Sequence, residues 1–261
     1  MNNYEKIIVL EDGGNLLSQA NQILKTTEKI VGIEQTSAGY EKLKDLKLNF
    51  PIINVARSYA KLKVESPMIA KTFIERLNHA LSKLKLVPKM VLILGAGAIG
   101  NAIQEKLKEK YIIKKYDLDS KLSNYKIDEL KEILGSFDMI IGCTGKEIIN
   151  LSLYKYLKEG VILASASSSD REFSAVSLRK KINDKINCHG HIKVNDFYLL
   201  NCGFPVNFDG AENSANPNDI QITLALLFAA ICLATKEKYV TGLIELDSNI
   251  QNLIIEKFKE L

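Results

Sequence analysis

The sequence has little of what marks several large classes of protein. Only four of its 35 basic residues are arginines, at positions 57, 76, 171 and 179, and the formal net charge is +4. A nucleic-acid surface needs clustered basic side chains, which this pattern lacks. The longest largely apolar run, Ile222 to Ala234, falls short of the roughly 20 residues that cross a bilayer. We therefore expect neither a nucleic acid nor a membrane as a partner.

Cysteine is also scarce. The four cysteines, at positions 143, 188, 202 and 232, show no spacing typical of a disulfide framework, and the first residues lack the features of a signal peptide. We therefore expect reduced thiols in a cytoplasmic protein. The one cluster with metal-like residues is Cys188-His189-Gly190-His191, which would need a fourth ligand from elsewhere, so we predict no bound metal.

The sequence does contain a glycine-rich turn between a strand and a helix. Val91 to Leu94 suit a buried parallel strand and lead directly into a GxGxxG motif, after which apolar residues recur at helical spacing. Gly95 would allow the tight turn, and Gly97 would let the backbone approach a pyrophosphate. Gly100 would let the helix pack closely against the strand.

An acidic residue completes this motif. A second strand pattern begins at Tyr111 and leads to Asp117, which is placed to bind the hydroxyls of an adenosine ribose. At the start of the intervening helix, the N–H groups near Ala98 and Ile99 would bind the phosphates. The combination predicts bound NAD. Asp117 favours NAD over NADP, and the pair Lys114-Lys115 leaves NADP as the alternative.

The remaining pattern alternates strands and helices. Strands are predicted at residues 6–10, 29–33, 51–55, 138–143 and 161–166, and several polar clusters follow them directly. Ser66 and Pro67 have the residue types of an N-cap and a first helical position, and they predict the start of a long helix. A helix from Ile127 to Leu134 would end at Gly135, and further helices are expected at 220–234 and 248–258.

We therefore predict an α/β fold, with a Rossmann-type doubly wound parallel sheet and a second, truncated α/β lobe. The predicted NAD-binding domain covers residues 68–216. The second lobe, on the substrate side, would combine residues 1–67 with 217–261. Chemistry is expected at the carboxyl ends of the parallel strands, because ligands bind there in open α/β sheets.

Several clusters, in order along the chain, resemble the S-adenosylhomocysteine hydrolase family. They are Asp12-Gly13-Gly14, Gly32 to Gly39, Pro51 to Val55 with Lys61 and Glu65, Thr144-Gly145, Asp170-Arg171-Glu172, Phe204 to Asn207, and Tyr239 to Gly242. The resemblance implies an enzyme that oxidises a ribose hydroxyl with tightly held NAD. It implies that Thr144, Gly145 and Asn207 lie on the nicotinamide side.

The resemblance also implies a catalytic set. Lys61 would take the proton of the hydroxyl group, and Asn54, Asp12 and Glu65 would tune this lysine and hold the substrate. The chemistry is reasonable because hydride leaves a carbinol carbon readily only if the hydroxyl proton is removed as well. A lysine must first lose its own proton, which repulsion by the nearby Lys63 would favour and the two carboxylates would oppose.

The departures from the family concern its proton-shuttling residues. Gln35 stands where the family has a second loop glutamate, and Ser168 where it has a histidine. Glu212 to Pro217 replaces a Gly-His-Pro segment. Counterparts of the family's N-terminal part and of its C-terminal lysine-tyrosine tail are missing from this sequence. We therefore expect the oxidation half of the reaction but not hydrolysis of S-adenosylhomocysteine.

Three hypotheses about function follow. The first is an NAD-dependent enzyme that oxidises a secondary hydroxyl of a small metabolite, of which a nucleoside is one example. The second is a non-catalytic NAD(H)-binding subunit or sensor, and the third is a half-enzyme completed by another chain. We expect a small-molecule substrate and a homodimer, because a shortened lobe would leave apolar surface to cover.

Overall fold

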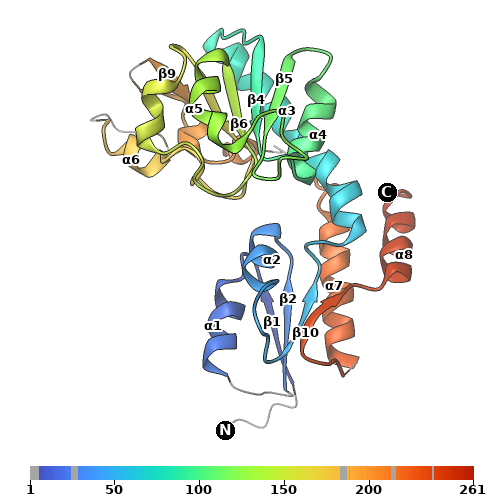
Figure 1. Ribbon diagram of the computed structural model, residues 1–261. Helices are drawn as coiled ribbons and strands as arrows, with labels where there is room; N and C mark the ends of the chain where they lie inside the picture. The colour runs from blue at the N-terminus through green and yellow to red at the C-terminus, as the bar shows by residue number, and fades with distance from the viewer. Residues whose placement is uncertain are drawn as a thin grey trace. The chain divides into compact units, whose positions relative to one another are not determined.

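The computed structural model describes residues 6–24, 29–182, 187, 189–194, 196–212, 216–236 and 238–261. The chain divides into two compact units. Unit 1 combines Met1–Glu65 with Asn216–Leu261, and unit 2 is Ser66–Ala215. Each unit is built on its own sheet with helices around it (Figure 1). The predicted α/β class with parallel sheets is confirmed.

Unit 1 has a four-stranded parallel sheet in the order β1-β2-β3-β10. Its strands are β1 (Ile7–Glu11), β2 (Ile30–Glu34), β3 (Pro51–Asn54) and β10 (Gly242–Glu245). The sequence pattern did not predict β10. The register places the carboxyl ends of the strands side by side, so that Glu11, Glu34, Asn54 and Glu245 share one edge.

The helices of unit 1 supply its core. They are α1 (Asn15–Ile23), α2 (Ser37–Leu43), α7 (Gln221–Lys236), α8 (Ser248–Phe258) and the short π-helix η1 (Lys61–Glu65). Leu17 of α1 and Leu43 of α2 are fully buried against Phe50 and Ile52. Helix α7 packs on β1, β2 and α8. None of the described helices combines the length and the apolar character that a membrane crossing requires.

Unit 2 has a six-stranded sheet in the order β5-β4-β6-β7-β9-β8. Its strands are β4 (Met90–Leu94), β5 (Ile112–Tyr116), β6 (Met139–Gly142), β7 (Ile162–Ser165), β8 (Ile192–Val194) and β9 (Phe197–Leu199). All the pairings are parallel except that of β8 with β9. This order is of the doubly wound type, because β4 lies between the strand that follows it and β6.

The central strand β4 shows why its sequence is continuously apolar. Val91 and Ile93 pack into one core cluster, with α3 (Ser66–Leu84) and α4 (Ala98–Leu107). Leu92 and Leu94 point to the opposite face and join the second cluster. Successive side chains of a strand alternate between faces, so a strand covered on both sides has no polar positions.

Two predicted helices are present but differ from the prediction in detail. The predicted helix from Ile127 to Leu134 is broken into η2 (Ile127–Glu129), α5 (Leu130–Ile133) and η3 (Leu134–Ser136), and Gly135 lies inside the last piece. Ser66 is not an N-cap, because η1 runs directly into α3 and Ser66 is a helical residue. The other pieces of unit 2 are η4 (Leu151–Tyr156), α6 (Ala175–Arg179), η5 (Leu200–Gly203) and η6 (Val206–Phe208).

Asp138 stabilises the amino-terminal edge of the unit 2 sheet by binding residues next to two neighbouring strands. Burial alone would raise the pKa of Asp138, but its ion pair with Lys158 and the hydrogen bonds donated by the N–H groups of Met90 and Lys89 outweigh burial and lower the pKa to about 2. This carboxylate therefore stabilises the fold fully above its ordinary pKa of 3.8, and its contribution disappears as the pH falls through about 2.

We expect Asp138→Asn to lower the free energy of unfolding at pH 7 by about 1–2 kcal/mol, because Lys158 is half exposed and water screens the pair. Urea unfolding of both proteins measures the difference. It should shrink as the pH is lowered from 4 towards 2. A difference that stays constant over this range would show that the charge of Asp138 contributes nothing.

Candidate nucleotide and catalytic sites

The turn after β4 forms the centre of the first site. Gly95 has a φ of 97°, and a Cβ there would lie 2.9 Å from Cγ2 of Thr144. A Cβ at Gly100 would lie 2.0 Å from the carbonyl oxygen of Gly95, so only glycine lets the helix begin so close to the turn. A Cβ at Gly97 would meet no atom within 4 Å in the part of the chain that the structure describes. The space in front of the turn is therefore open.

Helix α4 begins at this open space. Its N-cap is Gly97, and no side chain of the described residues caps it. Asn101, one turn into the helix, instead donates from Nδ2 to the carbonyl oxygen of Ala96 at 2.6 Å and fixes the turn. The first turn of a helix carries N–H groups without intrahelical partners and a partial positive charge. The backbone at Ala98 and Ile99 is thus suited to an anion.

Asp117 lies beside the same turn, at the end of β5. Its Oδ2 accepts a hydrogen bond from the N–H of Ala96 at 2.6 Å, and its Oδ1 accepts one from Asp119 at 2.9 Å. Each carboxylate oxygen has a second lone pair, so this partly buried group can still accept from two hydroxyls. Of the two nearby lysines, Lys115 is bound through Nζ to Asn101 Oδ1 at 2.9 Å.

The turn after β6 lies next to the glycine turn and is held by Glu172. Oε1 of Glu172 accepts hydrogen bonds from the N–H of Thr144, from Thr144 Oγ1 at 3.0 Å and from the N–H of Gly145 at 3.1 Å. Oε2 accepts from Ser165 Oγ at 3.0 Å. Burial raises the pKa of Glu172, and these hydrogen bonds oppose that rise.

A strained loop carries Asn207. Asn201, Cys202 and Gly203 have φ values of 48°, 51° and 88°, and Asn201 holds the loop by donating from Nδ2 to the carbonyl oxygen of Pro205 at 2.7 Å. Asn207 follows in η6, and its Oδ1 is buried without a hydrogen-bond partner among the described residues. A buried amide oxygen without a partner is costly. It suits a ligand that donates an N–H.

Unit 1 gathers polar side chains at the carboxyl edge of its sheet. Gln35 donates from Nε2 to Oδ1 of the exposed Asp12. Asn54 is 1% exposed; it donates from Nδ2 to Glu245 Oε1 at 2.9 Å and accepts from the N–H of Arg57 at 3.2 Å. Asp12 and Asn54, two of the predicted site residues, therefore lie at the edge where parallel sheets bind ligands. They have different hydrogen-bond partners.

Lys61 and Glu65 form a pair on η1. Lys61 Nζ lies 3.3 Å from Glu65 Oε2, with 13% and 15% of the two side chains exposed. Thr223 of α7 donates from Oγ1 to the other oxygen of Glu65. A π-helical turn is uncommon and is found frequently at functional sites. The structure thus brings together two of the four predicted catalytic residues through a direct contact.

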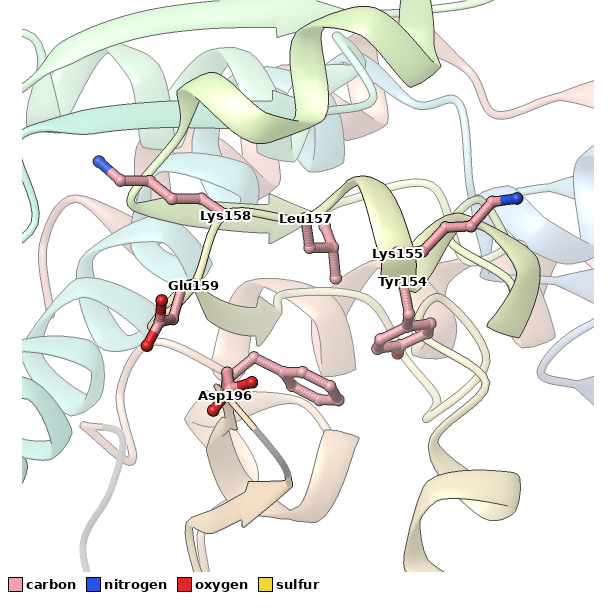
Figure 2. Close-up of a pocket in the computed structure, with 7 residues that line it drawn as sticks. Tyr154, Lys155, Leu157, Lys158, Glu159 and Asp196 are labelled. Carbon is pink, nitrogen blue, oxygen red and sulfur yellow. The ribbon is translucent and has the colours of Figure 1, made fainter.

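Two cavities of the described chain lie in unit 2. The larger, about 340 Å³, is lined by Tyr154, Lys155, Leu157, Lys158, Glu159, Asp196 and Phe197. Figure 2 shows the amino groups of both lysines directed away from its centre. Because Glu159 precedes β7 and Asp196 precedes β9, this cavity lies at the amino-terminal edge of the sheet. It is therefore separate from the glycine turn.

The smaller cavity, about 270 Å³, is bordered by Ser168, His189, Phe204, Pro205 and Phe208. Pro205 forms a bridge with Ser165 at the carboxyl end of β7. This cavity therefore lies at the carboxyl edge of the sheet, as do the glycine turn and the loop that carries Asn207.

In the cluster Cys188-His189-Gly190-His191, His191 has a structural role. Cys188 lies outside the described residues. His191 accepts a hydrogen bond at Nδ1 from the N–H of Asn201 at 3.1 Å, and burial, together with the charge of Lys83, lowers its pKa. His191 thus supports the strained loop. Among the residues that the structure describes, no group of three or more histidine, cysteine or acidic side chains could hold a metal ion.

Cys143, at the end of β6, is a free thiol. Burial raises its pKa well above the ordinary value, and the nearby Glu172 raises it further. A thiolate is the reactive form of cysteine, so this environment opposes a nucleophilic role.

Glu172 and Asn201 are important residues that the sequence did not single out. Glu172 was noted only as part of a motif that resembles a family, and Asn201 not at all. The role of Glu172 depends on the pairing of β6 with β7, which brings Thr144 and Ser165 to it from different loops. Their local sequence carries no signal beyond a polar residue after an apolar strand.

Comparison with curated proteins finds the uncharacterized protein Rv0104 of Mycobacterium tuberculosis strain H37Rv, which is 42% identical over 239 residues. The match covers 88% of this chain and 46% of that protein, and the uncharacterized protein MT0113 of strain CDC 1551 gives the same values. The chain thus spans about half the length of the curated relatives it matches. No family model matches the chain.

Among solved structures, the NAD+-bound 3-phosphoglycerate dehydrogenase of Entamoeba histolytica is 14% identical, with 82% of each chain covered and a TM-score of 0.45. A D-isomer-specific 2-hydroxyacid dehydrogenase family protein of Klebsiella pneumoniae is 13% identical, with 88% of this chain and 94% of that chain covered and a TM-score of 0.44. The resemblance to S-adenosylhomocysteine hydrolases rests on the sequence motifs.

Proposed function

We propose that the chain binds NAD(H) in unit 2 and uses it to oxidise a secondary hydroxyl of a small metabolite. The observation that carries this proposal is the open, uncapped start of α4 at Gly97, with the carboxylate of Asp117 beside it. This point is also where β4 pairs with β5 on one side and β6 on the other, which is the usual position of a nucleotide in doubly wound sheets.

Each part of the dinucleotide has a matching group in unit 2. The N–H groups at the start of α4 would bind the diphosphate, and Asp117 would accept from the ribose hydroxyls. Thr144 and Asn207, whose Oδ1 has no hydrogen-bond partner among the described residues, would orient the carboxamide of the nicotinamide. When bound, NAD would supply the acceptor for a hydride from the carbinol carbon.

Oxidation of a hydroxyl also needs an acceptor for its proton. We assign this role to Lys61, as the resemblance to S-adenosylhomocysteine hydrolases implies, with Asp12, Asn54 and Glu65 holding the substrate and the lysine. The carbinol then loses one hydride and one proton, so that the product is a ketone and the charges balance. A homodimeric state, a cytoplasmic location and a nucleoside-like substrate stay predictions.

Replacement of Asp117 tests the cofactor assignment. We expect Asp117→Ala to raise the Kd for NADH by about 10- to 100-fold, because hydrogen bonds to a charged group contribute about 1.5–3 kcal/mol. The Kd for NADPH should change much less. Fluorescence titration with both nucleotides measures this. Asp119→Asn, two residues along the same loop, is the control and should bind NADH normally.

A non-catalytic NAD(H)-binding subunit or sensor is the second candidate. The contact of Lys61 with Glu65 favours it, because a general base must be available to the substrate and here the Nζ atom is engaged by a carboxylate. Nicotinamide absorbance near 340 nm, followed with a panel of small alcohols and nucleosides, separates the two. Reduction of NAD with any of them supports the enzyme.

A further inference from the structure

Glu172 is a charged residue with only 1% of its surface exposed, and it binds two loops at once. Three donors from Thr144 and Gly145 converge on Oε1, and the hydroxyl of Ser165 binds Oε2. A Cβ at Gly142 would lie 2.2 Å from Oε2, so the carboxylate rests directly on the end of β6. These contacts fix the position of both carboxylate oxygens of Glu172.

The Thr144-Gly145 turn, which Glu172 holds, packs directly against the glycine turn at Gly95. Cγ2 of Thr144 would lie 2.9 Å from a Cβ at Gly95, and the carbonyl carbon of Cys143 would lie 3.1 Å from it. A rotation of Thr144 would therefore either push on Gly95 or leave a gap beside it. On the other side, Gly145 has a φ of 68° and faces open space.

We propose that Glu172 is the positioning residue of the nucleotide site: by holding the N–H groups of Thr144 and Gly145, it sets the conformation of the glycine turn that binds the diphosphate. This rests on the proposed function, because unit 2 must bind a dinucleotide for the turn to matter. The decisive property is the reach of the acceptor oxygen, since all three donors meet at one atom.

Two substitutions separate reach from charge. Glu172→Gln keeps an acceptor oxygen at the same distance from the backbone and can donate to Ser165, but it has no charge. Glu172→Asp keeps the charge but withdraws the carboxylate by about 1.5 Å, the length of one C–C bond. Ser165→Ala is the matched control, because it removes the partner of Oε2 and leaves Oε1 untouched.

The Kd for NADH is measured by fluorescence titration for the four proteins, and hydrogen exchange of peptides that contain residues 95–101 and 143–146 is measured without nucleotide. We expect Glu172→Asp to raise the Kd by at least about tenfold, as small misplacements in preorganised sites do, and to speed exchange in both peptides. Glu172→Gln and Ser165→Ala should stay within about threefold of the unaltered protein.

Each other outcome overturns part of the scheme. An unaltered Kd and unaltered exchange in Glu172→Asp would refute the positioning role while the proposed function stands. A loss in Glu172→Gln but not in Glu172→Asp would show that charge, not reach, is decisive, and an equal loss in both would refute reach as the one decisive property. If the unaltered protein does not bind NADH, the proposed function and this inference both fail. Should Glu172→Asp not fold, loss of affinity in Glu172→Gln would refute the inference by itself.

Discussion

Replacing Gly97 by alanine is expected to leave the fold intact and to weaken NADH binding strongly. The backbone at Gly97 has φ −70° and ψ −168°, which alanine adopts readily, and the added methyl group would meet no atom of the described residues within 4 Å. It would instead occupy the space in which we propose that the diphosphate binds. Overpacking costs about 1–3 kcal/mol, which corresponds to about 5- to 150-fold in Kd.

The control is the same substitution three residues later. Gly100→Ala would place a methyl group 2.0 Å from the carbonyl oxygen of Gly95, so the backbone must move and the free energy of unfolding should fall by about 3 kcal/mol. Urea unfolding and NADH titration of both variants distinguish loss of structure from loss of the site. Normal NADH binding by Gly97→Ala would contradict the placement of the diphosphate.

Replacing Lys61 by methionine is expected to abolish hydride transfer and to spare cofactor binding. Methionine matches the length of the lysine stem but cannot accept a proton, and general bases contribute about 100- to 10,000-fold to rates. The rate of nicotinamide reduction should therefore fall by this factor, while the Kd for NADH, which depends on unit 2, should stay unchanged.

Lys71→Met provides the control, because Lys71 lies on the following helix α3, is exposed and has no role in the proposed mechanism. Stopped-flow absorbance at 340 nm gives the rate of the chemical step for the three proteins. Equal rates in Lys61→Met and the unaltered protein would remove Lys61 from the mechanism. Because Lys61 is paired with Glu65, the free energy of unfolding should be measured alongside.

The parts of the fold that the sequence predicted are those with a strong local signal. The glycines from Gly95 to Gly100 and the apolar run before them require no knowledge of distant residues, and their turn is as expected. Strand β10 escaped because it is short and only half buried, and it exists through pairing with β3. Ser66 had the residue type of an N-cap, but the chain arrives at it already helical.

The candidate site was predictable to a similar extent. The position of Asp117 beside the glycine turn could be predicted, because its distance from the glycines is set by one helix and one strand. The hydrogen-bond partners of the site residues could not be predicted, since Glu245, Thr223 and Glu172 reach them from distant parts of the chain. The roles assigned to the site residues stay predictions.

The pairing of β10 with β3 has a consequence for the order in which the protein takes shape during synthesis. Domains generally fold as units, starting with the amino-terminal one as the chain emerges. Here unit 1 needs residues Gly242–Glu245 to complete its sheet, whereas unit 2 is continuous from Ser66 to Ala215. Unit 2 can therefore fold on the ribosome first, and the segments β1 to β3 must wait until residues Gly242–Glu245 have been translated.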